Sequence, residues 1–412
     1  MAGKKQDNAS RQNLALAEPG AKPAAVMWLL CGFLLALPIG EWSLRQSVEM
    51  NRDRSWFAVV NAITLTGFTS TIATNTYATG GRVVVFGLTI VGMLFSMIVG
   101  GMAVARILRL PYGDGQIARS AMWVSGILVV GGAIPLIAAG DAPFEAFMLS
   151  ASALGNSGHY FGRLPGLLGW RTQAVLMPMS VLGGLGLPVL MEMGDALRGR
   201  RRLSVHSRLV LKMTAGVYLV VFGACFLVQV VEEASSGAVR GMELIRAAGS
   251  SSVAAVNSRT AGFPLEYAQD MPRVMQWIVI LAMVVGGSPG GTAGGVKTTT
   301  VAELYSGVVG ALRGRPAGRA FAVAATWAGL YMLMAVLVLI LLLALAPQVA
   351  ADRLVFETIS ALSNVGLSHE VVMMVGAGLE VLTLAMLLGR LAPLGVLWWM
   401  ARTTREAEVA VG

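Results

Sequence analysis

The chain has 412 residues, of which 56% are hydrophobic and only 13% are charged. Because a soluble domain carries roughly 25% charged residues, this composition excludes an ordinary soluble protein and predicts an integral membrane protein. The net charge of +9 would fit a nucleic-acid partner, but its distribution along the chain fits membrane topology better.

Basic residues gather in alternate connections between the apolar stretches, which is the positive-inside pattern. These residues are Lys4, Lys5, Arg11 and Lys22; Arg106, Arg109 and Arg119; Arg198, Arg200, Arg201, Arg202 and Arg208; Arg313, Arg315 and Arg319; and Arg402 and Arg405. Most acidic residues lie in the opposite connections. We therefore predict no nucleic-acid partner, a multi-pass protein of the cytoplasmic (inner) membrane, and both termini in the cytoplasm.

Four consecutive repeats are predicted, each with a long apolar helix, a short helix, a glycine loop and a second apolar helix. They occupy residues 24–112, 113–200, 201–312 and 313–402, between an N-terminal arm (1–23) and a C-terminal tail (403–412). The predicted helices are 24–44, 55–65 and 82–108; 121–139, 143–154 and 173–193; 209–231, 241–256 and 272–304; and 320–346, 350–362 and 379–400. The expected fold is thus all-α.

The short second helix of each repeat is too short to cross a bilayer, because a spanning helix needs about 20 residues. We interpret it as re-entrant, with the glycine loop bringing the chain back. Irregular backbone at membrane depth is tolerated only where it is buried in protein or lines an aqueous path. Four re-entrant helix-loop units around one central ion pathway would resemble a potassium channel.

The glycine loops recur with central glycines Gly67, Gly158, Gly262 and Gly366, separated by 91, 104 and 104 residues. A near-constant period indicates one structural unit used four times. Backbone carbonyls at such loops can replace the water shell of a potassium ion. The expected ion-binding residues are Thr66, Gly67, Ser157, Gly158, Ala261, Gly262, Val365 and Gly366.

Residues 286–300, with the sequence GGSPGGTAGGVKTTT, interrupt an apolar stretch with six glycines and a proline. This composition cannot form a good helix. We expect a flexible, weakly hydrogen-bonded segment, of the kind that moves readily. The alternative interpretation is a cytoplasmic linker, but apolar residues flank the segment on both sides.

The string at 286–300 resembles one found in the Trk/Ktr/HKT superfamily of potassium transporters, closest to its bacterial Ktr and Trk membrane subunits. Supporting matches are SRTAGF at 258–263, ETISALSNVGLS at 357–368, LGGLGLP at 182–188 and Gly389-Arg390. The resemblance covers roughly residues 24–402. In the plant branch of this family, serine at the first filter glycine accompanies sodium preference, so glycine in all four loops favours potassium.

The resemblance implies potassium uptake through the four loops, with the glycine-rich segment as an intramembrane gate. Its implied gating residues are Gly286, Gly287, Ser288, Pro289, Gly290, Gly291, Thr292, Gly294, Gly295, Lys297 and Arg390. It also implies a homodimer bound to a ring of cytoplasmic nucleotide-binding (RCK/KTN-type) regulatory subunits. We expect no bound cofactor, and we expect K⁺ to be the transported ion.

The second loop departs from the family pattern, because His159 stands where phenylalanine is usual. An imidazole there could add pH sensitivity, or it could simply pack in place of the phenyl ring. Cys31 and Cys225 lie in apolar helices and indicate neither a disulfide framework nor a zinc site.

Three alternatives remain open. A sodium- or proton-coupled cation transporter would have the same architecture. A coupled carrier of organic solutes would need inverted repeats and acidic residues at the membrane midplane. A membrane-embedded enzyme would have to use Ser288, His159 and Glu357, but these residues belong to no nucleophile–base motif. We therefore predict that the chain is not an enzyme.

Overall fold

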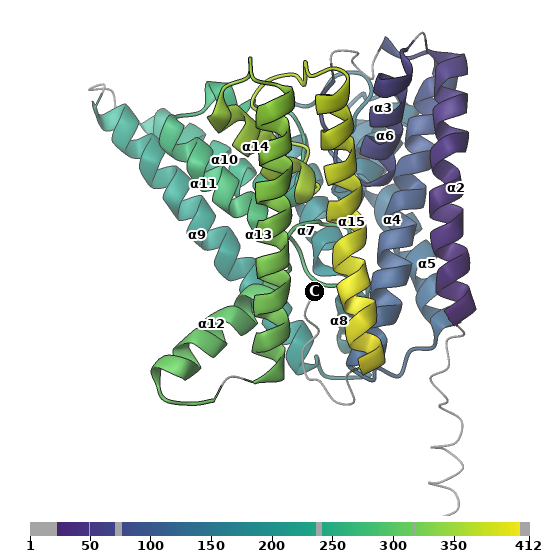
Figure 1. Cartoon of the computed structure of the whole chain (residues 1–412), viewed down its shortest axis with the longest axis vertical. Coiled ribbons are helices and arrows are strands. Elements are labelled where there is room, and N and C mark those ends of the chain that lie inside the picture. The colour runs from purple at the N-terminus through teal and green to yellow at the C-terminus, as the bar shows by residue number, and fades with distance from the viewer. Residues whose placement is uncertain (1–22, 49, 71–75, 236–240, 317, 404–412) are drawn as a thin grey trace, which may run out of the picture.

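The computed structural model describes residues 23–48, 50–70, 76–235, 241–316 and 318–403 (Figure 1). Within these ranges the chain is helical, and its only β-type pairings are two isolated bridges, Ser70 with Val372 and Val285 with Val296. The all-α fold is as predicted. Almost all of the predicted N-terminal arm and C-terminal tail lies outside the described residues.

The first half of the chain contains two long helices on either side of a short one, followed by a third long helix, a second short helix and a broken helix. These elements are α2 (Pro23–Ser47), α3 (Arg52–Ile63), α4 (Thr79–Ile107), α5 (Asp114–Ala138), α6 (Pro143–Gly155), η2 (Thr172–Leu176), α7 (Met177–Leu185) and α8 (Leu187–Leu197).

The second half also alternates long and short helices, and its chain leaves the helical conformation between α11 and α12. These elements are α9 (Val205–Ser235), α10 (Gly241–Val256), η3 (Asn257–Ala261), η4 (Ala268–Asp270), α11 (Arg273–Val284), α12 (Thr298–Leu312), α13 (Arg319–Leu345), α14 (Ala351–Leu362) and α15 (Ala377–Thr403).

Six described helices are long and apolar enough to cross a membrane: α2, α4, α5, α9, α13 and α15. The helix predicted over 173–193 is broken, and the stretch predicted over 272–304 is interrupted around residues 286–300, as their glycine and proline content predicts. The first is two helical pieces, Thr172–Leu185 and Leu187–Leu197, bent by 102°. The bend falls at Gly186, whose φ of 91° and ψ of 144° lie outside the helical region. The second stretch ends as a helix at Val284 and resumes only at Thr298.

The short helices α3, α6, α10 and α14 carry signals that favour a helix start. Each has an acidic residue in its first turn, namely Asp53, Glu145, Glu243 and Asp352. A negative charge there stabilises the positive end of the helix dipole. In Figure 1, α3, α6, α10 and α14 all lie toward the end of the molecule opposite the start of α2.

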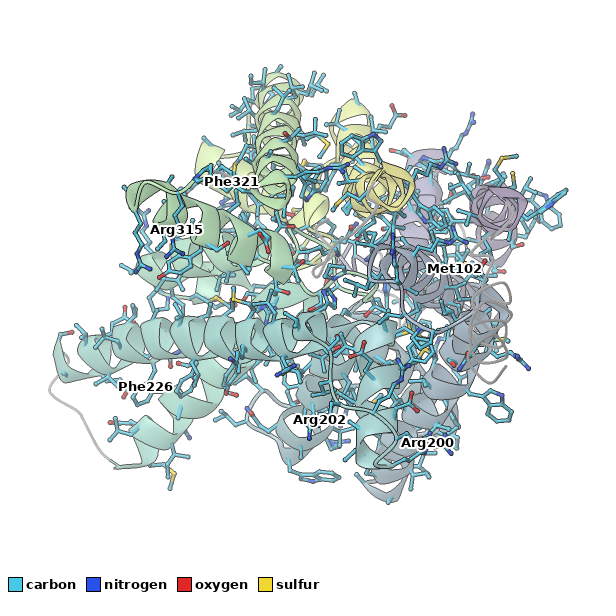
Figure 2. The ribbon with its side chains drawn as sticks, turned by 90° about the horizontal axis from the view of Figure 1, so that it is seen from below. Met102, Arg200, Arg202, Phe226, Arg315 and Phe321 are labelled. Atoms are coloured by element: carbon cyan, nitrogen blue, oxygen red, sulfur yellow. The ribbon has the colours of Figure 1, made fainter. Side chains whose placement is uncertain are left out.

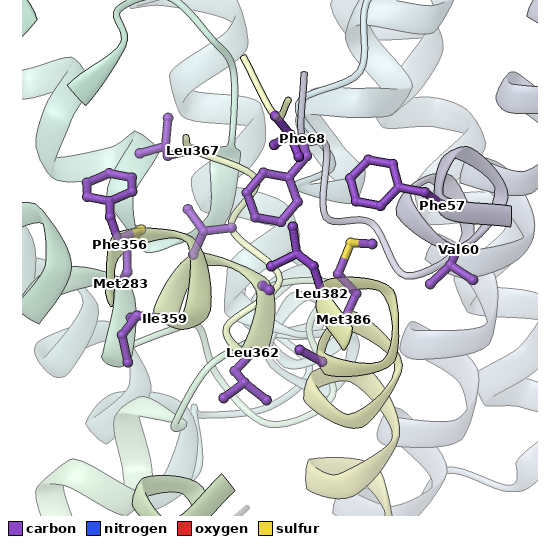
Figure 3. Packing of buried hydrophobic residues seen from close by; sticks show 14 of the residues in the cluster. Phe57, Val60, Phe68, Met283, Phe356, Ile359, Leu362, Leu367, Leu382 and Met386 are labelled. Atoms are coloured by element: carbon purple, nitrogen blue, oxygen red, sulfur yellow. The ribbon is translucent and has the colours of Figure 1, made fainter. Parts of the chain in front are cut away.

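The start of α2 and the end of α15 lie at the same end of the molecule (Figure 1). The view from that end shows Arg200, Arg202 and Arg315, which belong to connections that the sequence marks as basic (Figure 2). The main apolar core lies between the long helices and the short ones. Phe57, Phe68, Phe356, Leu362 and Met386 pack there, in the region where α3, α14 and α15 meet (Figure 3).

Candidate functional site

Four glycine loops follow the short helices: loop 1 (residues 64–68), loop 2 (155–159), loop 3 (258–263) and loop 4 (363–367). Their central glycines have φ values of 91°, 65°, 69° and 81°, in the left-handed region that side chains rarely adopt. In loops 1, 2 and 4 the residue two positions earlier is also left-handed: Leu65, Asn156 and Asn364. Asparagine adopts this conformation readily at helix ends, whereas Leu65 is strained by it, and such strain is concentrated at functional sites.

The four loops touch one another in a closed ring. A Cβ added to Gly67 would overlap the Ser157 carbonyl, and one on Gly158 would overlap the Gly262 carbonyl. In the same way, a Cβ on Gly262 would overlap Val365 O, and one on Gly366 would overlap Thr66 O. Each glycine is therefore required so that the carbonyl of the next loop can approach its backbone.

An asparagine behind loop 1 fixes the backbone of that loop. The Asn61 amide oxygen accepts hydrogen bonds from the N–H groups of Gly67 (2.8 Å) and Phe68 (2.9 Å), and its Nδ2 donates to Phe68 O (2.9 Å). Asn257 supports loop 3 similarly, accepting from the Phe263 N–H (2.9 Å) and donating to Phe263 O (2.7 Å).

Asparagines within loops 2 and 4 reach other parts of the site instead. Asn364 Nδ2 donates to Thr66 Oγ1 (3.0 Å) and to Met386 O (2.8 Å), so it joins loop 4 to loop 1 and α15. Asn156 Nδ2 donates to Ser180 O (3.0 Å) and to Thr292 Oγ1 (2.9 Å). The ring is thus supported from behind at loops 1 and 3, and tied to its surroundings at loops 2 and 4.

His159 follows the central glycine of loop 2, as Phe68, Phe263 and Leu367 follow the glycines of the other loops. All four side chains are buried. His159 also lines a small cavity beside loops 1 and 2, together with Phe57, Asn61 and Tyr77. The histidine therefore occupies a packing position that apolar residues fill in the other three loops.

The glycine-rich segment (residues 286–300) forms backbone hydrogen bonds with the broken helix of the second repeat. Ser288 N–H donates to Gly184 O (2.8 Å), Thr292 N–H donates to Gly183 O (3.1 Å), and Leu187 N–H donates to Gly290 O (3.1 Å). The expectation of a weakly hydrogen-bonded segment is therefore wrong. The break at Gly186 supplies partners that an intact helix would have used internally.

The same segment touches the other repeats as well. A Cβ on Gly100 of α4 would come within 2.8 Å of Gly290, and one on Gly294 would overlap Ser363 O at the start of loop 4. Arg259 of loop 3 donates to Gly286 O (2.9 Å) and to Thr214 O of α9 (3.3 Å). The segment thus contacts elements from all four repeats.

Two buried basic side chains are bonded to carbonyls of this segment. Arg390 Nη1 donates to Thr292 O (2.6 Å), and its Nε donates to Thr64 O of loop 1 (2.8 Å). Lys297 Nζ donates to Ala293 O (2.6 Å), and Thr292 Oγ1 donates to Leu154 O at the end of α6 (2.9 Å). Arg390 therefore ties the segment directly to loop 1.

A cavity of only about 10 Å³ lies between the glycine-rich segment and α4 and α15. Its lining includes Ser96, Gly291, Gly294, Lys297 and Arg390. A cavity needs roughly 10–15 Å³ to hold one water molecule. This cavity is therefore too small for a hydrated ion.

The chemistry that these groups offer is oxygen coordination by backbone. None of the four loops contains an aspartate or glutamate, and among the described residues no cluster of three or more histidine, cysteine, aspartate or glutamate residues could hold a metal ion. Carbonyl oxygens suit a weakly held monovalent cation, whereas a ring of carboxylates would trap divalent ions. The arrangement can therefore replace part of a cation's water shell.

The residues proposed for an enzyme are not arranged for catalysis. The Ser288 hydroxyl lies 3.1 Å from that of Thr298, and Glu357 accepts from the His369 backbone N–H at 3.0 Å. His159 lies in the cavity beside loops 1 and 2. The described contacts thus give Ser288 neither a histidine nor a carboxylate as a base.

The predicted ion-binding residues all lie in the ring, and the predicted gating residues lie in or against the glycine-rich segment. The Thr260 side chain in loop 3 is outside the described residues. Sequence reasoning missed the supporting roles of Asn61, Asn257, Asn156 and Asn364, and the link through Arg259. An asparagine near the end of each short apolar helix is a recurring feature of the sequence, but it does not by itself identify the hydrogen-bond partners.

A family model described as TrkH, cation transport protein, matches residues 142–403. The Ktr system potassium uptake protein B of Bacillus subtilis is 25% identical over 420 residues, covering 92% of this chain and 93% of that protein. The potassium/sodium uptake protein NtpJ of Enterococcus hirae is 28% identical over 207 residues, covering 47% of this chain and 45% of that protein.

The crystal structure of the potassium transporter TrkH from Vibrio parahaemolyticus has a similar fold. Its TM-score to this chain is 0.72 at 18% sequence identity, and the match covers 93% of this chain and 86% of that structure. The likeness therefore extends over nearly the whole described fold, including the first repeat that precedes the family match.

Proposed function

The chain belongs to the TrkH family of cation transport proteins, and from that premise we propose that it carries potassium ions across the cytoplasmic membrane through the ring of four glycine loops. The observation that carries this proposal is the ring itself, in which each central glycine accommodates a carbonyl of the next loop. The short helices and their loops then act as four re-entrant units around one pathway. Carbonyls near Thr66–Gly67, Ser157–Gly158, Ala261–Gly262 and Val365–Gly366 take the place of water around the ion.

The glycine-rich segment acts as the gate on the cytoplasmic side of the ring. The cavity of about 10 Å³ beside it is too small for a hydrated ion, which supports a closed state. Arg390 holds the segment through Thr292 O and adds a positive charge that opposes cations. Opening requires these contacts to be exchanged for others.

The proposed assembly is a homodimer in the inner membrane, with both termini in the cytoplasm. The start of α2, the end of α15 and the arginine-rich connections at one end of the molecule support this orientation. The match to a protein of the Ktr system supports a separate regulatory partner, for which we propose a cytoplasmic ring of RCK/KTN-type nucleotide-binding subunits.

The first experiment is potassium uptake in cells that lack other potassium uptake systems, with a candidate regulatory subunit co-expressed. We expect the wild-type chain to restore growth at limiting potassium. Gly262→Ser should lower the preference for K⁺ over Na⁺ roughly tenfold, because strain of about 1–3 kcal/mol at one loop distorts the ring. Ion fluxes into proteoliposomes measure this preference.

The matched control is Gly126→Ser on α5, where an added Cβ meets nothing within 4 Å. This variant should keep wild-type selectivity. If Gly262→Ser were equally selective, the glycine loops would not form the filter. If the wild-type chain carried Na⁺ as well as K⁺ or depended on a proton gradient, a coupled cation transporter of the same architecture would replace the proposal.

A further inference from the structure

We propose that the groove between α2, α4 and α15 is a binding site for an anionic phospholipid of the cytoplasmic leaflet. The groove has a volume of about 700 Å³, within the range of small-molecule sites in proteins. Its apolar wall includes Met27 and Leu30 of α2, Phe95 and Val99 of α4, and Leu394 of α15. All three helices are long enough to span the membrane.

The groove faces the surroundings of the protein, not its core. Met27 is 63% exposed and Trp399 is 55% exposed. Apolar side chains exposed on a spanning helix lie against lipid, so acyl chains already surround this opening. The occupant that such a groove meets most often is therefore a lipid.

The lining has two arginines and no acidic residue. Arg106 lies in the last turn of α4 and Arg402 in the last turn of α15, so both charges lie at the basic end of the molecule. Arg106 donates to both oxygens of Asp114 (3.1 and 2.9 Å), with its guanidinium 4.5 Å from the centre of the Trp398 ring. Asp114 thus neutralises Arg106 and holds it in place.

Arg402 supplies the remaining positive charge. It is exposed, and among the described residues it forms no salt bridge. Basic pockets between spanning helices on the cytoplasmic side attract anionic headgroups, and tryptophans favour the same depth. This charge selects an anionic phospholipid over a zwitterionic one.

The site adjoins the closed cavity beside the glycine-rich segment. Leu394 lines both the groove and that cavity, and Arg390 lies one turn earlier on α15. Pro393 lies between them, where it removes a backbone hydrogen bond and weakens the helix. A lipid that contacts Leu394 therefore contacts the part of α15 that holds the glycine-rich segment through Arg390. Lipid binding could in this way regulate the position of the segment.

The test measures lipid bound to the full-length protein after exchange into phosphatidylcholine nanodiscs with rising fractions of phosphatidylglycerol. We expect wild type to retain phosphatidylglycerol selectively. Arg402→Gln should reduce the preference for phosphatidylglycerol over phosphatidylcholine at least five-fold, because it removes an exposed positive charge that attracts the headgroup. Arg313→Gln, an exposed arginine at the end of α12, is the matched control and should bind as wild type does.

A second pair of variants tests the groove itself. Gly395 lines it, and a Cβ there meets nothing within 4 Å, so Gly395→Leu adds bulk to the groove from a position where the backbone leaves room for a Cβ. It should reduce bound phosphatidylglycerol several-fold, whereas Gly329→Leu on α13, equally open, should not. The proposal is overturned if both groove variants bind as wild type, if retention ignores headgroup charge, or if removing residues 1–22 increases lipid binding. The last result would mean that the N-terminal arm fills the groove.

Discussion

At the scale of single residues, the ring depends on four glycines that no other residue can replace without strain. Each has a positive φ, and at each an added Cβ would meet the backbone of another loop. Either reason alone disfavours a side chain. Together they mean that neither a change of backbone dihedral angles nor a shift away from the neighbouring loop would relieve the strain. The four positions are therefore constrained by one another.

Arg390 is the residue whose removal should open the path. Arg390→Gln and Arg390→Lys should both raise resting K⁺ flux roughly tenfold or more, because a hydrogen bond from a charged group is worth about 1.5–3 kcal/mol and one such bond restrains Thr292 O. Flux into proteoliposomes without a regulatory subunit is the measurement, with Arg315→Gln, an exposed arginine, as control.

The Arg390→Lys variant is included because lysine keeps the positive charge but lacks the planar guanidinium group that bonds the carbonyls of Thr64 and Thr292 at once. A lysine variant that stays as tightly closed as wild type would show that the charge, not the two-point contact, restrains the ion. The proposal that Arg390 closes the path by bonding Thr64 O and Thr292 O would then be wrong.

The sequence predicts these residues unequally. The central glycines were predictable because they recur at a nearly constant period. The hydrogen-bonding role of Asn61 was not, because an asparagine in a short helix has no fixed partner until the loop turns back over it. The partners of Arg390 lie 98 and 326 residues away along the chain, beyond any local pattern.

At the scale of elements, two interruptions support each other. The glycine-rich segment breaks the stretch between α11 and α12, and Gly186 breaks the one between α7 and α8. The first break was predictable from glycine and proline content. The second was not, because a single glycine in an apolar stretch is compatible with a helix, and its conformation depends on a segment from another repeat.

Substitutions at two neighbouring glycines, Gly184 and Gly186, distinguish an effect on the helix break from a general effect on packing. A Cβ on Gly186, where φ is 91°, would lie 2.7 Å from Pro289 O, whereas one on Gly184 meets only Ala293 Cβ at 3.7 Å. Gly186→Ala should destabilise the protein by roughly 1–3 kcal/mol and raise resting flux, because it displaces the glycine-rich segment. Gly184→Ala should leave both nearly unchanged. Thermal unfolding in detergent and flux are the two measurements.

Equal behaviour of the two alanine variants would contradict this interpretation. It would mean that the segment tolerates a displaced α7–α8 bend, so that the hydrogen bonds from Ser288 and Thr292 to the second repeat are dispensable for closure. The gate would then have to depend on Arg390 and Lys297 alone.

At the scale of the whole molecule, four similar units form one asymmetric assembly. The loops make equivalent contacts around the ring, but only the third repeat contributes the glycine-rich segment, and only the fourth contributes Arg390. A symmetric ring suits ion binding, whereas control of one pathway needs only one moving part. Under the proposed function, the molecule thus divides ion binding and closure between repeated and unique features.

This division predicts that access from the cytoplasm is controlled on one side of the ring. Ser96 of α4 is 2% exposed and lines the cavity of about 10 Å³. In a background with Cys31→Ser and Cys225→Ser, a cysteine introduced by Ser96→Cys should react slowly with a charged methanethiosulfonate reagent. Adding Arg390→Gln should speed the reaction roughly tenfold, matching the loss of about 1.5 kcal/mol from the closed state.

The control is Ser306→Cys on the exposed side of α12, which should react quickly with or without the arginine. An unchanged rate at position 306 would show that Arg390→Gln does not alter the reaction of the reagent with an exposed thiol, so a faster reaction at position 96 would report greater access to that position. If the reaction at position 96 were fast in the wild-type background, the narrow cavity would not be the barrier. The block to ions would then lie in the ring, and the glycine-rich segment would support the filter without closing the path.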